Sequence, residues 1–413
     1  MNNKFWSGFA GGLTGGVLIF AIIFAVYTSA VEEKFEGLEN AAAGAQSTEA
    51  SGLLADEEFQ EKIEKLESLI DAYYIEEVSD EELKEGIYDG LLYSLEDPYS
   101  CYYTQEEYEE LMISSSGVYC GIGATVQQSI TTGIITIVKP FVDCPAYNAG
   151  LLQGDIVYKV DGVEVTGRDL TEVIGYMKGE EGTTVTIEVI RDGETDPISL
   201  VVERARVEVP TVEYRMLEDQ IGYIYIMEFD EITEEQFREA IDDLEKQGME
   251  GLIIDVRDNP GGLYSSVCNM LDRLLPEGLI VYTEDKYGRR EEKRSTAEES
   301  FDKPMAVLIN GSSASASEIF AGALQDYQLA TIVGTQSYGK GIVQSLFPLY
   351  DDSAIKLTVS RYYTPNGVCI HGTGITPDIE IDLDNAAKKL VVIPEDQDTQ
   401  LQKAIEAVKE KLK

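Results

Sequence analysis

The chain has little basic charge and almost no histidine. Its 413 residues include 32 Lys and Arg against 76 Asp and Glu, which gives a formal net charge of −44, and they include one histidine. A surface this acidic repels phosphate backbones, so the composition argues against a nucleic-acid partner. The acidic residues are spread along the chain and are not gathered in one tail, which is typical of a solvated acidic surface and not of a cation store.

Cysteine pairs and phosphate-binding loops are also missing. The cysteines are scattered without any C-x-x-C pair, so zinc-ribbon and thioredoxin-type chemistry have no support. Their odd number leaves at least one thiol free, and no disulfide framework follows from the spacing. The glycine-rich run D-V-R-D-N-P-G-G (255–262) matches neither G-x-G-x-x-G nor G-x-x-x-x-G-K-[ST]. The five cysteines are Cys101, Cys120, Cys144, Cys268 and Cys369.

The amino terminus is a long apolar stretch. Residues 1–31 carry no charged side chain after Lys4, a length sufficient to span a hydrocarbon core of about 30 Å. The basic residue before the stretch and the pair Glu32–Glu33 after it favour a membrane anchor with its start in the cytoplasm and the bulk of the chain outside. A cleaved signal peptide is the alternative, because T-S-A (28–30) resembles a cleavage site. Residues 32–55 are small and polar and are predicted to form a tether.

Two regions with different periodicity follow the tether. Residues 56–114 have apolar side chains at three- and four-residue steps, which predicts helices, with a break at Asp97-Pro98. Residues 115–204 change to a period of two and are predicted to form a small domain of short strands with one or two helices. The expected strands are 134–138, 155–160 and 184–190, and the expected helix is 170–178.

Residues 205–413 alternate between strand and helix patterns. This rhythm is typical of an α/β core with right-handed crossovers, so the whole chain is predicted to be a multidomain α+β protein. The last segment is an amphipathic helix. The expected strands are 223–229, 251–257, 305–310 and 330–334, and the expected helices are 233–246, 265–275, 316–326 and 399–412.

A cluster of serines lies between one of these strands and the next helix. The run S-S-A-S-A-S-E (312–318) contains a capping-box pattern in which Ser315 precedes Glu318 by three residues, so Ser315 can be read as a simple helix cap. The same corner suits a nucleophile, because the first amides of a helix and its dipole stabilise the negative charge of a tetrahedral acyl intermediate. Both interpretations stand at this point.

A nucleophilic serine needs a base, and Lys340 is the better candidate. The only histidine, His371, lies in a glycine-rich stretch, and no Ser-His-Asp pattern is evident. A lysine has a pKa near 10.4 in water, and a base active at neutral pH needs that value lowered by roughly 3 units, about 4 kcal/mol. Residues 327–350 contain no acid around Lys340, which favours such a shift. A surface lysine in a turn is the alternative. Gly261 and Gly262 also allow two interpretations. One of them can supply a backbone N–H to an oxyanion, or the pair can simply form a turn.

Several stretches together resemble the carboxyl-terminal processing (tail-specific) serine peptidases. The resemblance runs in order from about residue 56 to the end of the chain. It implies a PDZ domain at 115–204 and a ClpP/crotonase-like α/β peptidase core at 205–413. The stretches are L-E-D-P-Y-S-C-Y-Y (95–103), D-V-R-D-N-P-G-G-L (255–263), G-S-S-A-S-A-S-E-I-F-A-G-A-L-Q-D (311–326), G-T-Q-S-Y-G-K-G-I-V-Q (334–344) and K-L-T-V-S-R-Y-Y-T-P-N-G (356–367).

The resemblance also implies roles for individual residues. It implies a Ser-Lys dyad of Ser315 and Lys340, assisted by Gln344, with no metal and no cofactor. The implied oxyanion donors are the N–H groups of Ala316 and Gly262. In the PDZ domain, the loop whose amides hold a peptide carboxylate corresponds to Gly121, Ile122 and Gly123. His371 departs from the sequence pattern of this family, in which relatives often have glutamine at that place.

The expected function is therefore a membrane-anchored serine endopeptidase that binds unstructured protein C-termini outside the cell membrane. One alternative is a catalytically inactive PDZ scaffold, and another is an acyl-CoA enzyme on a related fold. The helical segments at 56–112 and 399–412 resemble those through which some relatives form homodimers. Their apolar faces can equally belong to the domain core.

Overall fold

The computed structural model describes residues 55–297, 301–390 and 393–413, and these fall into two compact units that divide between Lys84 and Glu85. The expected membrane helix within residues 1–31 and nearly all of the tether lie outside the described residues. In the part of the chain that the structure describes, no helix combines the length and apolar character needed to cross a membrane.

The described part of the first unit is helical, as predicted. Helix α2 (Glu57–Tyr73) begins at Asp56, whose carboxylate accepts the N–H groups of Glu58 and Phe59. This is a side-chain N-cap, which supplies acceptors for amides that the helix leaves unpaired. Helix α3 (Asp80–Tyr93) begins in this unit and ends in the next. In the second unit, α4 (Gln105–Ser116) follows.

The inserted domain, residues 118–208, is a strand-rich body entered and left through one antiparallel strand pair, β2 and β9. Its sheet has the order β3-β4-β5-β7-β8, with β6 paired to β5. Alternate residues of β7, namely Val185, Ile187 and Val189, are fully buried, which is the period-two pattern of a half-buried strand. The elements are β2 (Val118–Gly121), β3 (Ala124–Gln128), β4 (Ile135–Pro140), α5 (Pro145–Asn148), β5 (Ile156–Val160), β6 (Val163–Glu164), α6 (Leu170–Met177), β7 (Thr184–Ile190), β8 (Ile198–Glu203) and β9 (Ala205–Glu208).

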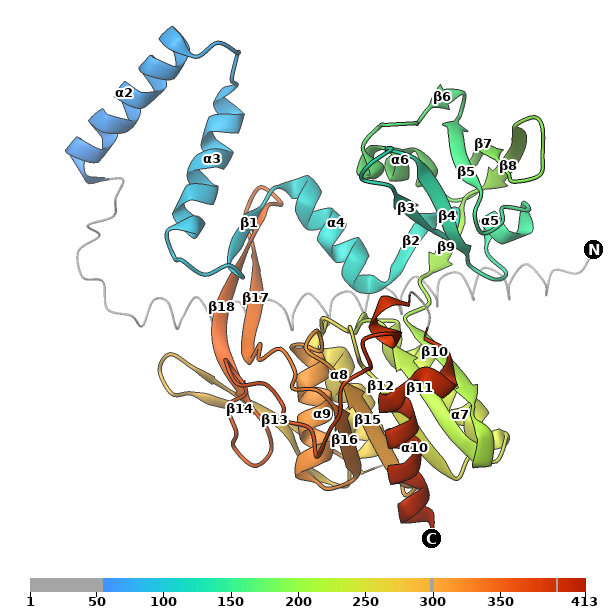
Figure 1. Ribbon diagram of the computed structural model, residues 1–413. Helices are drawn as coiled ribbons and strands as arrows, with labels where there is room; N and C mark the ends of the chain where they lie inside the picture. Colours follow the sequence, from blue (N-terminus) through green and yellow to red (C-terminus); the bar gives the residue numbers. More distant parts are fainter. Residues whose placement is uncertain (1–54, 298–300, 391–392) are drawn as a thin grey trace, which may run out of the picture. The chain divides into compact units, whose positions relative to one another are not determined.

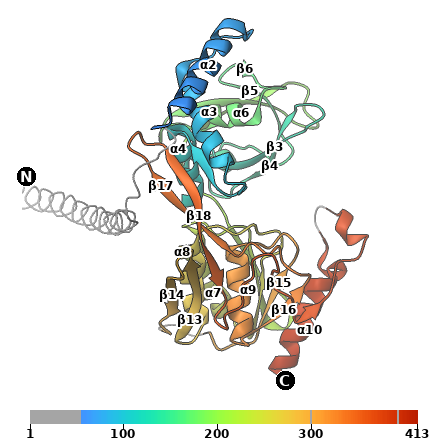
Figure 2. The ribbon, with the colours of Figure 1, turned by 90° about the vertical axis from the view of Figure 1, so that its left-hand side faces the viewer.

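The core is a six-stranded sheet covered on both faces. Its order is β10-β11-β12-β15-β16-β19, parallel except for the β10–β11 pair. Ile254 and Val307 pack with α7–α9, whereas Ile253 and Leu308 pack with α10. Figure 2 shows α9 and α10 on opposite sides of strands β15 and β16. Strands that are buried on both faces have nearly continuous apolar sequences. The elements are β10 (Val212–Met216), β11 (Ile221–Ile226), α7 (Thr233–Lys246), β12 (Gly251–Asp255), α8 (Tyr264–Leu274), β15 (Met305–Ile309), α9 (Ala316–Asp326), β16 (Ala330–Gly334), β19 (Ile379–Glu380) and α10 (Thr399–Leu412).

A second, antiparallel sheet was not predicted. Its strands are β1 (Cys101–Tyr103), β13 (Gly278–Asp285), β14 (Arg290–Ser295), β17 (Ile342–Pro348) and β18 (Ala354–Tyr363). Strand β18 pairs with β17 along one edge, and with β1 and then β13 along the other (Figure 1). Residues near position 101 therefore lie beside residues near position 356. This pairing brings the segment that contains Tyr99 to the strands that follow Lys340.

Candidate active site

Ser315 stands at the corner between β15 and α9. It is the N-cap of α9, with φ 54° and ψ −113°, a backbone conformation that non-glycine residues rarely adopt. The Asn259 carbonyl oxygen holds this corner in place. It accepts the Ala314 N–H at 3.1 Å and the Ser317 hydroxyl at 3.0 Å. Such strain persists only where the surrounding structure holds it, and it is common at active sites.

The structure distinguishes the four serines of the run. Ser313 and Ser317 are fully buried, and each hydroxyl donates to a main-chain carbonyl oxygen, at 2.7 and 3.0 Å. Ser312 is exposed on the turn. Ser315 is half-buried at the helix start, beside the glycine corner. Of the four, only Ser315 combines access with a helix N-terminus.

The glycine corner lies directly against Ser315. A Cβ atom on Gly261 would be 2.8 Å from Ser315 Cβ and 3.1 Å from the Ala316 nitrogen. The Gly261 N–H donates to Asn259 Oδ1 at 2.8 Å. Gly262 forms a parallel bridge with Phe229. The Phe229 N–H donates to the Gly261 carbonyl oxygen, and the Phe229 carbonyl oxygen accepts the Leu263 N–H. In a parallel bridge, the N–H of the bridged residue points away from the partner strand.

Glu318 joins the backbones of Ser315 and Lys340. Its side chain is fully buried, and Oε2 accepts the Ser315 N–H at 2.9 Å and the Lys340 N–H at 2.8 Å. Oε1 accepts the Ser337 hydroxyl at 2.5 Å and the Gly339 N–H at 2.7 Å. Four donors around one carboxylate compensate for the burial of its charge. In the sequence, Glu318 is recognisable only as part of a capping box, and its bonds to Ser337, Gly339 and Lys340 have no local signal.

Tyr362 makes a second connection between the same two residues. Its hydroxyl lies within hydrogen-bond distance of the Ser315 carbonyl oxygen, at 3.0 Å, and of the Lys340 carbonyl oxygen. The side chain is almost fully buried. Burial, and then the charge of Glu318, raise the pKa of Tyr362 well above its usual value, so this hydroxyl stays protonated. The main chains of Ser315 and Lys340 are thus fixed relative to each other by two buried side chains.

The Lys340 side chain lies over an aromatic ring. Its Nζ is 4.5 Å from the centre of the Tyr99 ring, a contact that favours the ammonium form. Burial, followed by the charge of Lys356, lowers the pKa of Lys340, whereas Asp97 acts in the opposite direction. The sequence window around Lys340 contained no acid, but the fold brings Asp97 close to it. The structure forms no hydrogen bond between Ser315 Oγ and Lys340 Nζ.

Gln344 and His371 lie near Lys340, but neither forms a hydrogen bond with it. Gln344 is on β17, opposite Thr358 in register, and its amide donates to the Thr358 hydroxyl at 3.3 Å. His371 is exposed and lines a cavity of about 440 Å³ together with Asp97 and Thr358. The cavity therefore reaches the surroundings of both Lys340 and Gln344.

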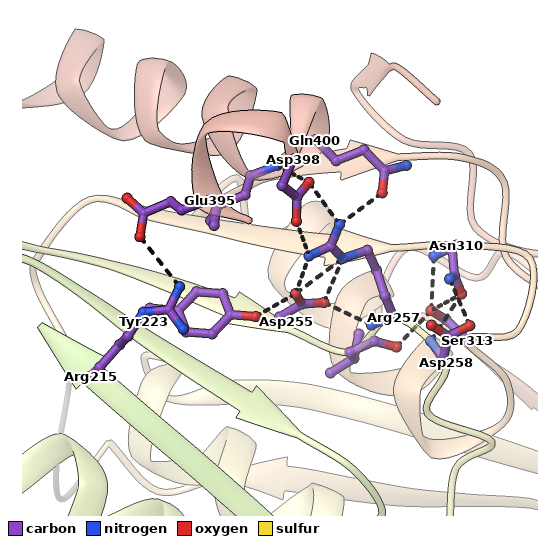
Figure 3. Close-up of polar contacts among 12 residues, drawn as sticks. Arg215, Tyr223, Asp255, Arg257, Asp258, Asn310, Ser313, Glu395, Asp398 and Gln400 are labelled. Atoms are coloured by element: carbon purple, nitrogen blue, oxygen red, sulfur yellow. Dashed lines mark hydrogen bonds and ion pairs between the residues drawn. The ribbon is translucent and has the colours of Figure 1, made fainter. Parts of the chain in front are cut away.

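A buried charge cluster lies at the end of β12, just before the glycine corner in sequence (Figure 3). The Arg257 guanidinium bonds to both oxygens of Asp255 and of Asp398, at 2.5–3.0 Å, and to Gln400 Oε1 at 3.0 Å. Burial acts to lower the pKa of Arg257, but the two carboxylates raise it overall. Tyr223 donates to Asp255 at 2.7 Å. This cluster ties the start of α10 to the strand end that leads into the corner.

In the inserted domain, Gly121 is the last residue of β2, and Ile122 and Gly123 form the turn to β3. Ile122 is buried and its carbonyl oxygen accepts the Ala146 N–H at 2.7 Å, while Gly123 turns the chain with φ 74°. Strand β3, which follows, is at the edge of its sheet. An edge strand has unpaired main-chain groups to which an extended peptide can add.

The described residues contain no cluster of three or more His, Cys, Asp or Glu side chains arranged to hold a metal ion. All five cysteines are free thiols.

Comparison with known proteins identifies the family of the chain. It is 39% identical over 318 residues, covering 75% of this chain and 72% of the other, to a carboxy-terminal-processing protease of Bartonella bacilliformis. It is 38% identical over 325 residues, covering 78% and 67%, to the carboxy-terminal processing protease CtpB of Bacillus subtilis. Residues 220–381 match peptidase family S41. This chain belongs to peptidase family S41.

Other parts of this S41 peptidase match further families. Residues 138–191 match the PDZ domain, and residues 13–107 match the activating protease CtpB N-terminal domain. A crystal structure from Bacteroides fragilis assigned to the S41 proteases superposes with a TM-score of 0.51 at 18% identity, covering 79% of this chain and 90% of that one, which shows a common fold. The predictions of a serine-type peptidase, a PDZ domain and a mixed α/β multidomain fold are confirmed.

Proposed function

We propose that this S41 peptidase cleaves peptide bonds with a dyad of Ser315 and Lys340. The observation that carries the proposal is the pair of buried connections, Glu318 and Tyr362, which fix the main chains of these two residues together. The strained φ of Ser315 and the lowered pKa of Lys340 add support. Nothing else in the serine run offers an accessible hydroxyl at a helix start.

The reaction begins with a proton transfer to neutral Lys340. Nζ leaves the Tyr99 ring and accepts the proton of the Ser315 hydroxyl, while Oγ attacks the carbonyl carbon of the scissile bond. The oxyanion that forms is stabilised by the N–H groups of Ala316 and Gly262. The Lys340 ammonium then gives its proton to the leaving amine, and the C–N bond breaks. Water, deprotonated by Lys340, cleaves the resulting ester.

Gln344 has a positioning role in this proposal. Its amide lies on the strand that follows Lys340, next to Thr358, from which it can turn to orient the amine during the reaction. Gly262 is preferred to Gly261 as the oxyanion donor, because the Gly261 N–H is already bonded to Asn259.

The test compares single variants on an unfolded protein substrate with a free apolar C-terminus. Ser315→Ala and Lys340→Ala each lower kcat by at least about 10³-fold, since each removes a group that acts only in the reaction. Lys340→Arg is equally inactive, because a guanidinium stays protonated. Ser312→Ala, three residues away on the exposed turn, is the matched control and stays within twofold. Normal cleavage by either dyad variant would refute the proposal.

The substrate class follows from the PDZ domain and from the names of the relatives. We propose that the Gly121–Gly123 loop binds the terminal carboxylate of an unstructured protein chain and that the tail adds to β3. The relatives named above are carboxy-terminal processing proteases, which supports an equivalent substrate here. Amidating the C-terminus of the substrate should raise KM more than it lowers kcat, because the amide loses the charge that the loop amides recognise.

The location rests on the sequence alone. We propose that residues 1–31 anchor the protein in the cell membrane with the peptidase on the extracytoplasmic side, as the uncharged stretch and its flanking charges indicate. Carbonate-washed membranes should retain the full-length chain, and external protease should degrade its peptidase domain. A soluble mature protein that begins near residue 31 would instead establish a cleaved signal peptide.

A further inference from the structure

Tyr99 contacts the proposed base but takes no part in the proposed reaction. Its ring centre lies 4.5 Å from Lys340 Nζ. At this distance the electron-rich face of a phenol ring attracts an ammonium group, whereas a neutral amine has no charge for the ring to attract. The contact therefore favours the protonated form of Lys340, which cannot accept a proton from Ser315.

Tyr99 is held in this place by the turn that carries it. Asp97 Oδ1 accepts the Tyr99 N–H at 3.1 Å, and Asp97 Oδ2 accepts the Ser100 hydroxyl at 2.6 Å. Ser100 is buried, and its oxygen in turn accepts the N–H of Thr358 on β18 at 3.0 Å. Strand β1, which begins at the next residue, continues this pairing with β18. The ring is thus attached to the antiparallel sheet and not to a free loop.

The main chain of Lys340 is fixed at two points, so its side chain is the part that moves between Tyr99 and Ser315. Glu318 Oε2 accepts the Lys340 N–H at 2.8 Å, and the Tyr362 hydroxyl lies at the Lys340 carbonyl oxygen. In the described part of the chain, Nζ forms neither a hydrogen bond nor an ion pair, and the ring is its polar contact. Rotation of the side chain therefore separates the resting and the reacting positions of Nζ.

The charges around Lys340 act on its protonation in both directions. Burial is the largest effect that lowers the pKa of Lys340, the charge of Lys356 adds to it, and Asp97 opposes both. The Glu318 carboxylate is already occupied by four donors. The ring acts in the same direction as Asp97, because it stabilises only the ammonium form. Further charged or titratable side chains line the cavity that includes Asp97, namely Glu284, Asp285, Lys286, Arg361 and His371.

We propose that Tyr99 is a positioning residue that holds Lys340 as an ammonium, away from Ser315, until the reaction begins. The inference rests on the proposed role of Lys340 as the base. Before it can act, Nζ must release its proton to water and leave the ring, and only then can it accept the proton of the Ser315 hydroxyl. Tyr99 thereby reduces the fraction of the enzyme that has a neutral lysine at neutral pH, but it does not change the rate at which that fraction reacts.

The test measures kcat/KM against pH for the full-length chain and an unfolded protein substrate, because this ratio reports the protonation of the free enzyme. Tyr99→Leu removes the ring and keeps an apolar side chain over Lys340. The rise of kcat/KM should move by about half a unit to lower pH, which makes cleavage below the rise about threefold faster, while the plateau at high pH stays the same. Tyr99→Phe keeps the ring and should keep the profile of the parent.

A matched control comes from the neighbouring strand. Tyr102 on β1 has its ring centre 5.3 Å from that of Tyr88, and Tyr102→Leu should leave the pH profile unchanged. A variant that keeps the shape of the side chain covers the case in which Tyr99→Leu folds poorly. A trifluorinated phenylalanine at position 99 has nearly the size of phenylalanine but a less negative ring face, so its profile should move to lower pH relative to Tyr99→Phe.

The outcomes separate this inference from the proposed function beneath it. If Lys340→Ala is inactive but neither Tyr99→Leu nor the fluorinated ring moves the rise to lower pH, the role of Tyr99 is refuted and the dyad stands. A lower plateau with an unmoved rise also refutes it, since Tyr99 would then only support the fold. If Lys340→Ala still cleaves, the proposed base is wrong, and the role of Tyr99 with it. A shift to lower pH in both variants at a constant plateau supports the inference.

Discussion

Replacing Glu318 by glutamine should damage both the stability and the activity of this peptidase. The carboxylate accepts four hydrogen bonds, two at each oxygen, from Ser315, Ser337, Gly339 and Lys340. A glutamine keeps one carbonyl oxygen, and its NH₂ group faces two donors. Rotating the amide does not help, because both oxygen positions are equally used. Each lost bond to a buried charged acceptor costs about 1.5–3 kcal/mol, so the variant should lose about 3–6 kcal/mol of unfolding free energy.

Two measurements test this expectation. Urea denaturation followed by circular dichroism gives the loss of stability. The rate of acylation by a serine-reactive probe, measured where the variant is still folded, gives the effect on the site. Because Glu318 fixes Ser315 relative to Lys340, we expect that rate to fall by at least about 10²-fold, as small misplacements of reacting groups do.

The chain provides a matched control for the same motif. Thr104 and Glu107 form a capping box at the start of α4, but there the glutamate is exposed. Glu107→Gln should therefore cost at most about 1 kcal/mol and leave acylation unchanged. Equal effects of Glu318→Gln and Glu107→Gln would refute the reasoning, since burial and the second pair of donors would then contribute nothing.

Two further predictions concern pH. Cleavage requires neutral Lys340, so its rate should rise with pH through a pKa below the usual lysine value; Lys356→Gln should move this rise to higher pH and Asp97→Asn to lower pH, as pH–rate profiles would show. Burial, and then Glu228, raise the pKa of Asp230 to about 7. The folded state therefore holds a proton that the unfolded state releases above about pH 4, and stability falls as pH rises from there to 7. Asp230→Asn should match the parent protein near pH 4 and exceed its unfolding free energy at pH 8 by about 2–4 kcal/mol in urea titrations; a constant difference across pH would contradict the assignment.

Local periodicity was enough to predict most elements of the parallel sheet and the inserted domain. Helices α7, α9 and α10 and strands β7 and β16 have the predicted bounds, because each has a buried stripe or an apolar run between clear breaks. The antiparallel sheet had no such signal. Strand β14, R-E-E-K-R-S, is charged and exposed except at its last residue, and it is held by pairing with β13. Pairing partners distant in sequence cannot be read from a single strand.

In the candidate site, too, the features that depend on a short stretch of sequence could be predicted, and those that depend on distant segments could not. Ser315 and Lys340 could be named from motifs, because a strand-to-helix corner and an acid-free window are local features. The proximity of Tyr99 and Asp97 to Lys340 depends on the pairing of β1 with β18, across about 250 positions of sequence. The Arg257 cluster likewise depends on Asp398 and Gln400. Glu318 was visible as a capping residue, but its bonds to residues 337–340 were not.

The pairing of early and late segments sets an order of assembly during synthesis. Strand β1 has no partner until β18 has been made, and the carboxylates around Arg257 are incomplete until residue 398 has been made. The strand pairings of the inserted domain all lie within residues 118–208, so this domain can form much earlier. We therefore expect a nascent chain that is able to fold its peptide-binding domain but unable to hydrolyse anything until nearly its last helix has emerged. This order of assembly keeps the peptidase harmless to the machinery that synthesises it.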